Sequence, residues 1–279
     1  MVKKIRKTTS KKRKISLAFC IILFLLILAT IWFFVPVTEH ITLENAPDNS
    51  ARAVLITDLH SCYYGKEQKN LLERIEKENP DLILLGGDIF DDKKKDDNAM
   101  KTLESLSQKY KCYYVTGNHE YWSGRASEIK EKVRNLGITV LEGDCETIEI
   151  KGRMIDICGV DDPDSLVEGT YEDQLQKAWE ATSEKHFKIL ISHRPEKTDL
   201  YEQYGYDLIV AGHAHAGQFR IPFTGRGYWA PDQGFMAKYV SGAYTLSNGS
   251  VMVVSRGLAR ESTPAPRFFN HPEIVVIDF

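Results

Sequence analysis

Five short apolar segments of this 279-residue chain are each followed by side chains that commonly bind metal ions. Each segment is rich in aliphatic or β-branched residues and ends at a polar or glycine position, which predicts a buried strand. The segments and the polar residues after them are RAVLIT with Asp58 and His60, DLILLGG with Asp88 and Asp91, CYYVTG with Asn118 and His119, KILIS with His193, and DLIVAG with His213 and His215. Because the carboxyl ends of strands in an α/β sheet share one edge, we expect these side chains to meet in one crevice.

The types of these side chains predict a pair of divalent cations. Imidazole, carboxylate and amide ligands without cysteine suit Mn, Fe, Zn, Co or Ni better than Cu(I) or an iron–sulfur cluster, and we favour Mn. Seven or more ligands are too many for one ion, so we expect two ions about 3.5–4 Å apart that share a bridging carboxylate. Such a pair clamps the attacking and leaving oxygens at phosphorus and lowers the pKa of a bound water, which becomes the nucleophile.

Each motif by itself is weaker evidence. Asp58 could cap a helix, a Gly-Asp pair commonly forms a turn, and a single histidine such as His193 is more often structural. The sequences GNHE and GHAH are more specific, because Gly, Asn and His together at a strand end disfavour simple packing. All five motifs in order, each at the end of a predicted strand, favour a metal centre over five unrelated structural roles.

The segments between the strands predict the elements that position these residues. Residues 68–79, 97–110 and 126–137 have helical spacing with charged outer faces. Alternating strands and helices predict an α/β domain whose helices cover a largely parallel sheet. Residues 139–160 and 219–279 contain hairpin turns and no obvious helix, which predicts a second, antiparallel part. We expect one continuous domain over residues 52–279, preceded by a stalk or linker over 36–51.

The predicted hairpin around the Lys151-Gly152 turn places Cys145 directly opposite Cys158. That register is compatible with a cross-strand disulfide outside the cell, but we favour two free thiols.

Charge is divided unevenly along the chain. Eight basic residues lie in the first 14 positions, and the first acidic residue is Glu39, so the body that follows is acidic. An acidic body without a basic stripe argues against nucleic acid as a partner. The nineteen residues 17–35 carry no charge and could cross a hydrocarbon core of about 30 Å.

These features predict a single-pass membrane protein. Residues 15–35 would form a transmembrane signal anchor, and the alternative of a cleaved signal peptide is disfavoured because WFFVPV does not resemble a cleavage site. The basic tail over residues 1–14 would be cytoplasmic, which places the domain on the outer side of the cell membrane.

The motifs DLH, GGDIFD, GNHE, SHR and GHAH resemble the five blocks of the calcineurin-like metallophosphoesterases. The later segments GHAHAGQFRIP, YVSGAY and VSRGLA resemble the YkuE-like bacterial branch of that family. The resemblance implies a four-layer α/β/β/α sandwich of two mixed sheets. It also implies that Asp58, His60 and His215 bind one metal, that Asp88 bridges, and that Asn118, His193 and His213 complete the second site.

The resemblance extends to residues around the metals. It implies that His119 is a general acid or a hydrogen-bond donor to the leaving group, and that Asp91 orients His119 or a ligating histidine. From their side-chain chemistry, Arg194, Arg256 and Arg260 are candidates to neutralise phosphate oxygens. Ala216 stands where we expected glycine. The aromatic residues after His215 could form an apolar lip, but we favour ordinary packing for them.

Together these observations predict a dimetal phosphoesterase that cleaves a phosphodiester or pyrophosphate bond, on a cell-envelope or lipid-linked substrate. One alternative is a UDP-diacylglucosamine pyrophosphatase-like hydrolase, which needs a cytoplasmic active site. A second is a metal-bound scaffold protein without catalytic activity, which the presence of all seven ligand positions and His119 disfavours. The sequence indicates no oligomeric state.

Overall fold

The computed structural model of the chain describes residues 34–164 and 171–279, apart from 45, 47–49, 222–223, 225, 261–266 and 268, together with a few positions between 16 and 24. The predicted transmembrane segment over residues 15–35 lies largely outside these residues. Among the residues that are described, no helix is long and apolar enough to cross a bilayer. The membrane anchor therefore stays a prediction.

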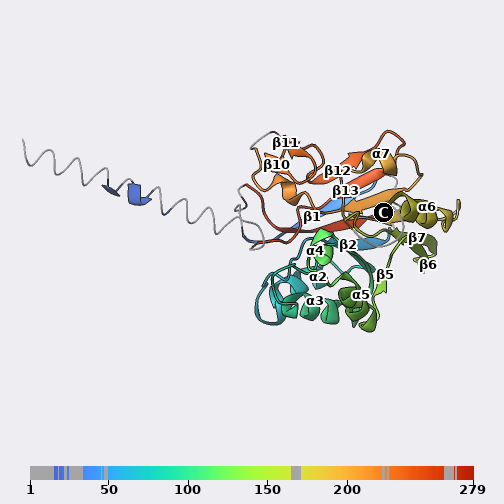
Figure 1. Ribbon diagram of the computed structural model, residues 1–279, viewed down its shortest axis with the longest axis horizontal. Helices are drawn as coiled ribbons and strands as arrows, with labels where there is room; N and C mark the ends of the chain where they lie inside the picture. The colour runs from blue at the N-terminus through green and yellow to red at the C-terminus, as the bar shows by residue number, and fades with distance from the viewer. Residues whose placement is uncertain are drawn as a thin grey trace, which may run out of the picture.

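Two six-stranded sheets form the centre of the fold (Figure 1). The first contains, in spatial order, β1 (Val37–Thr42), β14 (Glu273–Asp278), β2 (Arg52–Ile56), β3 (Leu82–Gly86), β4 (Lys111–Val115) and β5 (Thr139–Val140). Strands β2 to β5 are mutually parallel, whereas β14 is antiparallel to β2 and parallel to β1. This sheet is therefore mixed.

The second sheet is also mixed. It contains, in spatial order, β12 (Gly242–Thr245), β13 (Val251–Val254), β9 (Leu208–Ala211), β8 (Phe187–Ile191), β7 (Arg153–Gly159) and β6 (Asp144–Ile150). Its four central strands are parallel and its two edge strands are antiparallel to their neighbours. A separate two-stranded ribbon is formed by β10 (Trp229–Ala230) and β11 (Gly234–Phe235).

Helices cover the outer face of each sheet. On the first sheet, α2 (Lys69–Lys77), α3 (Asp97–Ser107) and α5 (Ala126–Asn135) bury their apolar faces against β2, β3 and β4. On the second, α6 (Tyr171–Glu180) and α7 (Thr198–Tyr201) contribute to a smaller cluster. The inner faces of the two sheets pack on each other through residues such as Leu84 and Ile189. The predicted four-layer sandwich of two mixed sheets is confirmed.

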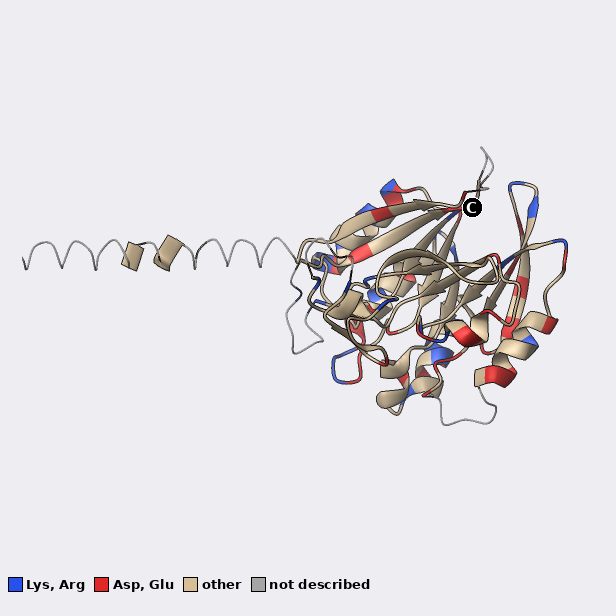
Figure 2. Ribbon diagram, turned by 90° about the horizontal axis from the view of Figure 1, so that it is seen from above, with Lys and Arg blue, Asp and Glu red and all other residues tan. Residues whose placement is uncertain are grey.

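The five predicted strands correspond to β2, β3, β4, β8 and β9. All five are covered on both faces, which is why their sequences are nearly continuous apolar runs rather than alternating ones. Charged residues concentrate on the helices and loops, and the strands are mostly uncharged (Figure 2). The three predicted helices are also confirmed. Helix α6 was not predicted, because Leu175 and Ala178 are its only buried apolar residues and two residues give a weak helical pattern of apolar positions.

The structure corrects two predictions about chain organisation. Residues 139–160 and 219–279 do not form a separate antiparallel part, because β7, β13 and β14 from these segments complete the two main sheets. Residues 37–42, which we expected in the linker, form β1 and pair with β14. The folded part thus begins before residue 52. Strand pairs between residues more than 200 positions apart leave no local signal in the sequence.

The predicted hairpin register is confirmed, with Ile150 opposite Arg153 and Cys145 opposite Cys158. The two cysteines form a disulfide, so our preference for free thiols was wrong. Among the described cysteines, Cys62 and Cys112 are free and buried. The bond links two adjacent strands at one edge of the second sheet.

Reduction of this disulfide with dithiothreitol should lower the free energy of unfolding. The two cysteines are 13 positions apart, and closing a loop of this size is worth about 3 kcal/mol through the entropy of the unfolded chain. Urea unfolding with and without dithiothreitol measures the difference. A Cys145→Ala, Cys158→Ala double variant serves as the control, because its curve should not respond to the reductant. Identical wild-type curves in the two conditions would contradict the assignment.

Candidate metal centre

The predicted metal ligands meet where strands of both sheets end. Asp58 and His60 follow β2, Asp88 follows β3 and Asn118 follows β4, all in the first sheet. His193, His213 and His215 follow β8 and β9 in the second sheet. The side chains meet as expected, but between two sheets rather than along the edge of one. Every one of these seven residues is buried.

One group of potential ligands consists of Asp58, His60 and His215, whose donor atoms all lie within 4.8 Å of one another. The Nε2 atom of His215 is 3.7 Å from Oδ1 of Asp58, and Nε2 of His60 is 4.0 Å from the same oxygen. These three residues are the set that the family resemblance assigned to one metal.

A second group consists of Asp88, His193 and His213. Nε2 of His193 is 3.2 Å from Oδ2 of Asp88, and Nε2 of His60 is 3.6 Å from that oxygen. Asp88 therefore lies between the two groups, where a bridging ligand is needed. The other ring nitrogen of His193, Nδ1, hydrogen-bonds the carbonyl of Gly86 at 2.8 Å, which leaves Nε2 to face the site.

Unpaired polar atoms show that this donor set fits cations. Buried side-chain atoms without a hydrogen-bond partner, among the described residues, include Nε2 of His60 and His193, Oδ2 of Asp88 and Oδ1 of Asn118. Buried polar atoms in folded proteins are normally paired. These four atoms belong to different motifs and lie on ligand candidates, so a shared cation accounts for all of them.

Electrostatics lead to the same conclusion. Burial alone would lower the pKa of His193, but the carboxylates of Asp88 and Asp58 outweigh it and raise this pKa to about 10. The two buried carboxylates of Asp58 and Asp88 therefore favour a positive charge next to them. Without a metal, a proton on His193 supplies that charge. Divalent cations satisfy this requirement more completely than protonated histidines.

The backbone at the ligands is strained. Left-handed φ values between 45° and 63° occur at five of the seven predicted ligands, Asp58, His60, Asp88, His213 and His215. Such a conformation is uncommon for residues other than glycine and costs about 1–2 kcal/mol per residue. Strain of this kind persists where surrounding structure enforces it, and it concentrates at functional sites.

Glu120 joins two of the ligand loops, although the sequence did not assign it a role. Its buried carboxylate accepts hydrogen bonds from the backbone N–H groups of Asp88 at 3.0 Å, Phe90 at 3.0 Å and Gly117 at 2.8 Å. The bond to Gly117 also caps the start of α4 (Asn118–Trp122). The GNHE motif contains this glutamate, and its position three residues after a potential helix cap was the signal available in the sequence.

Asp91 lies beside a histidine in the structure. Its Oδ2 atom is 3.3 Å from Nδ1 of His60, which places Asp91 in contact with a predicted ligand. Burial would raise the pKa of Asp91, but the contact with His60 and hydrogen bonds from the amides of Lys93 and Lys94 lower it. The side chain next to it, Asp92, holds Nδ1 of His119 at 2.8 Å. Sequence reasoning overlooked Asp92.

His119 lies at the opening of the site. Its side chain is 18% exposed, whereas that of His60 is completely buried, and the two rings meet edge to face with centroids 4.3 Å apart. Trp122 packs on its other side. Burial lowers the pKa of His119, and the nearby His60 acts in the same direction. The ring is thus fixed next to the ligands and still reaches solvent.

The three predicted substrate arginines all have other partners. Arg194 is buried and hydrogen-bonds Asp162 through two nitrogens, at 2.6 and 2.7 Å, and also Asp232. Arg256 forms ion pairs with Glu39 and Glu273.

The third of them, Arg260, donates to the carbonyl of Tyr63 and lies over the ring of Tyr64. Among the three, Arg194 contacts a predicted ligand, since its Nη1 atom is 3.1 Å from Nε2 of His213.

Asp232 is a further residue that sequence reasoning overlooked. It lies in the turn between β10 and β11, and its Oδ2 atom is 2.8 Å from Nε2 of His213. Because Asp232 holds Nε2, the other ring nitrogen of His213 is left for a metal. A carboxylate 19 residues after His213, in an irregular segment, has no recognisable spacing.

The C-terminal part of the chain also shapes the site. Asn270 donates to the carbonyl of His215 at 2.8 Å. Gly257 has φ +70°, and a Cβ atom at this position would lie 2.5 Å from Cβ of Asp58. Ala216, at the position where we expected glycine, has φ +53° and therefore carries the strain that glycine would avoid.

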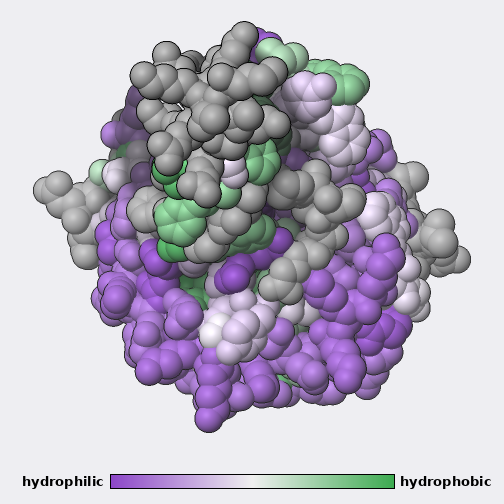
Figure 3. Space-filling model, turned by 90° about the vertical axis from the view of Figure 1, so that its left-hand side faces the viewer, coloured by the Kyte–Doolittle hydropathy of each residue, from purple (hydrophilic) through white to green (hydrophobic). Residues whose placement is uncertain are grey.

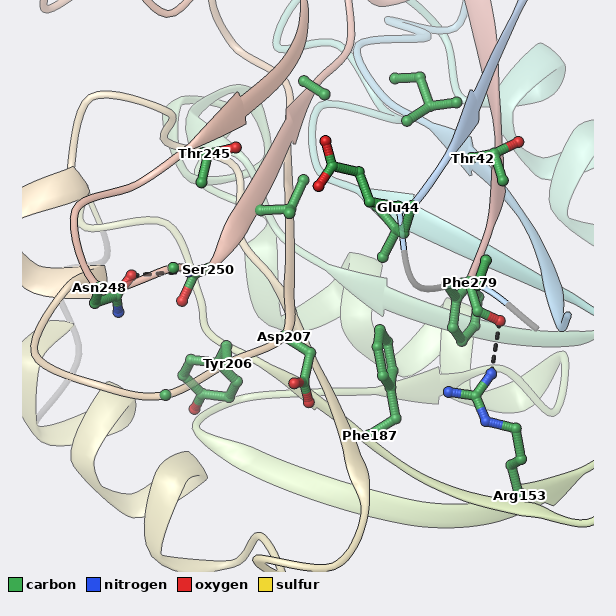
Figure 4. Close-up of a pocket in the computed structure, with 17 residues that line it drawn as sticks. Thr42, Glu44, Arg153, Phe187, Tyr206, Asp207, Thr245, Asn248, Ser250 and Phe279 are labelled. Carbon is green, nitrogen blue, oxygen red and sulfur yellow. Dashed lines mark hydrogen bonds between the residues drawn. The ribbon is translucent and has the colours of Figure 1, made fainter.

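A cavity of about 720 Å³ lies at the opposite end of the strands (Figure 4). Its lining includes Thr42, Arg153, Phe187, Asp207 and Phe279, and Arg153 donates to the carbonyl of Phe279 at 2.8 Å. None of the predicted ligands lines it. This cavity is therefore separate from the candidate metal centre.

Comparisons with known proteins support the same assignment. A sequence model described as calcineurin-like phosphoesterase matches residues 51–217. An uncharacterized metallophosphoesterase of Campylobacter jejuni is 29% identical over 236 residues, which cover 81% of this chain and 58% of that protein. The uncharacterized metallophosphoesterase YkuE of Bacillus subtilis is 29% identical over 81% of this chain and 77% of its own length.

Other relatives are longer than this chain. A Bos taurus protein named transmembrane protein with metallophosphoesterase domain is 28% identical over 77% of this chain and 50% of its own length. The chain spans about three fifths of the Campylobacter and Helicobacter relatives it matches. A Thermus thermophilus crystal structure is similar in fold, with a TM-score of 0.50 at 14% identity over 76% of this chain and 91% of that one.

A Gly257→Ala substitution should reduce metal binding. The added methyl group requires Asp58 to move and also strains a left-handed backbone, so one metal should bind more weakly. Metal content per chain after reconstitution, measured by inductively coupled plasma mass spectrometry, should fall from about two toward one. Gly249→Ala is the matched control, because Gly249 has φ +91° but no neighbour within 4 Å of the added atom. Equal metal content in the two variants would refute this role for Gly257.

Proposed function

Because the chain belongs to the calcineurin-like phosphoesterase family, we propose that it hydrolyses a phosphodiester or pyrophosphate bond with two divalent metal ions, of which Mn is favoured. The observation that carries this proposal is the pair of buried ligand groups on either side of Asp88. When bound, two such ions would polarise phosphoryl oxygens and supply an activated water. Asp88, His60 and His193 would hold the pair together.

His119 is the residue we propose to act on the leaving group. Its ring stands at the opening of the site, next to His60 but outside both groups of predicted ligands. Asp92 accepts from Nδ1, so Nε2 is the nitrogen that faces a leaving oxygen, and it can donate a proton only while the ring is an imidazolium. The lowered pKa of His119 makes that imidazolium a stronger acid. Asp92 also stabilises the positive charge that His119 carries before it gives up that proton.

The charges around the opening favour a diester over a monoester. Arg194 and Arg256 are already neutralised by carboxylates. Asp91, Asp92 and Asp232 lie close to the ligand histidines. Two bound divalent ions would attract both kinds of substrate, but the second negative charge of a monoester also meets these carboxylates. We therefore favour the diester, which carries only one negative charge near neutral pH.

The proposed substrate class follows from the proposed location. An uncharged run over residues 17–35, preceded by eight basic residues, favours a single-pass protein of the cell membrane with its catalytic domain outside the cytoplasm. Phosphodiesters in that compartment belong to lipid head groups and envelope polymers. A substrate of this kind, lipid-linked or part of the envelope, agrees with the acidic opening of the site.

The metal-reconstituted full-length protein should hydrolyse bis-nitrophenyl phosphate with a higher kcat/KM than nitrophenyl phosphate. The acidic opening disfavours the dianionic monoester, whereas the leaving group is the same in both substrates. Steady-state rates with Mn measure the ratio, and Asp88→Asn is the control that should remove activity on both. A strong preference for the monoester would overturn the diester proposal, and no turnover of either would overturn the enzymatic one.

His119→Gln should retain both metals and lose activity in a manner that depends on the leaving group. General acid catalysis contributes about 10²–10⁴-fold when the leaving oxygen is basic, and far less for nitrophenolate. Rates on a series of nitrophenyl and alkyl diesters measure this dependence, with metal content determined on the same samples. Equal losses across the series would show that His119 is not an acid.

A further inference from the structure

Large apolar side chains gather on the surface next to the metal centre. Phe219, Tyr228, Trp229, Phe235 and Met236, here called the apolar flap, are between 41% and 70% exposed. The rings of Phe219 and Tyr228 are 6.3 Å apart and those of Tyr228 and Phe235 are 5.4 Å apart. In the β10–β11 ribbon Trp229 lies opposite Phe235, and the amide of Met236 bonds the carbonyl of Tyr228. Contiguous exposed apolar surface on a folded domain commonly marks an interaction site.

The ordinary packing that we expected for these aromatic residues holds only in part. Tyr239 and Tyr244 pack against the buried cluster of the second sheet. Phe223, which belongs to the same expectation, lies outside the described residues. The apolar flap itself does not contribute to that cluster, so its composition needs another explanation.

Topology places the flap, the metal centre and the start of the folded chain at one end of the sandwich. Strand β1 is antiparallel to β2, so the beginning of β1 lies where β2 ends and the metal ligands begin. The flap follows β9, whose end carries His213 and His215. Across the sandwich β3 contacts β8 and β4 contacts β7, so the strands of the two sheets follow one another in the same direction. The edge strands β1 and β12 therefore lie at the same edge of the sandwich.

Hydrogen bonds connect Val35, which precedes β1, to the flap. Nδ1 of His271 bonds the carbonyl of Val35 at 3.0 Å, and the adjacent Asn270 donates to the carbonyl of Gln218 at 3.1 Å. The next residue along the chain is Phe219. Figure 3, which looks at this end of the molecule, shows hydrophobic surface in the upper half of the view and polar surface below it.

Positive charge lies beside this apolar surface. Val35, Pro36, Arg74 and Arg260 line one hollow, where Arg74 donates to the hydroxyl of Thr38 and Arg260 to the carbonyl of Tyr63. Arg226 and Lys238, near the flap, are exposed. Apolar and aromatic residues flanked by cations match the interfacial region of a membrane with anionic head groups.

We propose that the apolar flap docks on a lipid bilayer that contains anionic lipids, and that it turns the opening of the metal centre toward that surface. A bilayer is favoured over a second copy or a peptide because the nineteen uncharged residues 17–35 lead directly into Val35 at this end. Tyrosine and tryptophan are the residues that prefer the interface between head groups and acyl chains. The inference concerns binding only, so it does not rest on the proposed reaction.

Quenching of tryptophan fluorescence by brominated lipids tests the docking. Two full-length proteins each keep a single tryptophan, Trp229 or Trp179, with the other tryptophans replaced by phenylalanine, and both are reconstituted into vesicles with anionic lipid. Trp179, in α6, is the control because its ring packs against that of Tyr206, which lines the cavity at the opposite end of the strands. Trp229 should lose roughly half of its emission, and Trp179 little.

Equal quenching of the two tryptophans, or none of Trp229, would overturn the proposal. A photoreactive lipid in vesicles with the unsubstituted chain gives a second readout that does not depend on how the variants fold. Lipid adducts should appear in peptides over residues 219–241 and not over 171–180, which form α6. Adducts confined to residues 15–35, or crosslinks between the flaps of two copies, would reject the bilayer as the partner.

Discussion

The structure is organised around two buried carboxylates whose ion-pair partners, within the described part of the chain, are histidines. Asp58 and Asp88 are almost completely inaccessible, and the side chains closest to them are histidines. A buried carboxylate without a cationic partner is expensive, so the surrounding residues have to be arranged for the arrival of positive charge. The left-handed backbone at five ligands, the buried Glu120 that joins two loops and the close approach of Gly257 all serve that arrangement.

Around the ligands, a second set of carboxylates fixes the orientation of the histidines. Asp91 faces His60, Asp92 holds His119 and Asp232 holds His213. Each carboxylate contacts one ring nitrogen of its histidine and leaves the other ring nitrogen to face a metal or a leaving group. This contact determines the tautomer of the histidine. The Arg194 network extends this support, because Arg194 joins Asp162 to Asp232 and so connects the second sheet to the β10–β11 turn.

Much of the site could be predicted because each ligand directly follows an apolar run, and the end of a buried strand can be recognised locally. The division of those strands between two sheets could not, because parallel strands have the same pattern in either sheet. The pairing of β1 and β14, at opposite ends of the chain, likewise has no local signal. Asp92 and Asp232 were overlooked because their roles depend on where a neighbouring loop lies, and the disulfide because a register alone does not determine whether two cysteines are oxidised.

The origin of the ligands has a consequence for the lifetime of the protein. Each group combines residues from both sheets, since Asp58 and His60 meet His215, and Asp88 meets His193 and His213. Ions bound there would join the two halves of the sandwich at an edge where like-charged carboxylates otherwise repel each other. Ions that bind only the folded state of a protein stabilise that state by mass action. The supply of metal would then control how long the protein resists proteolysis, and starvation for the ion would remove the protein itself together with its activity.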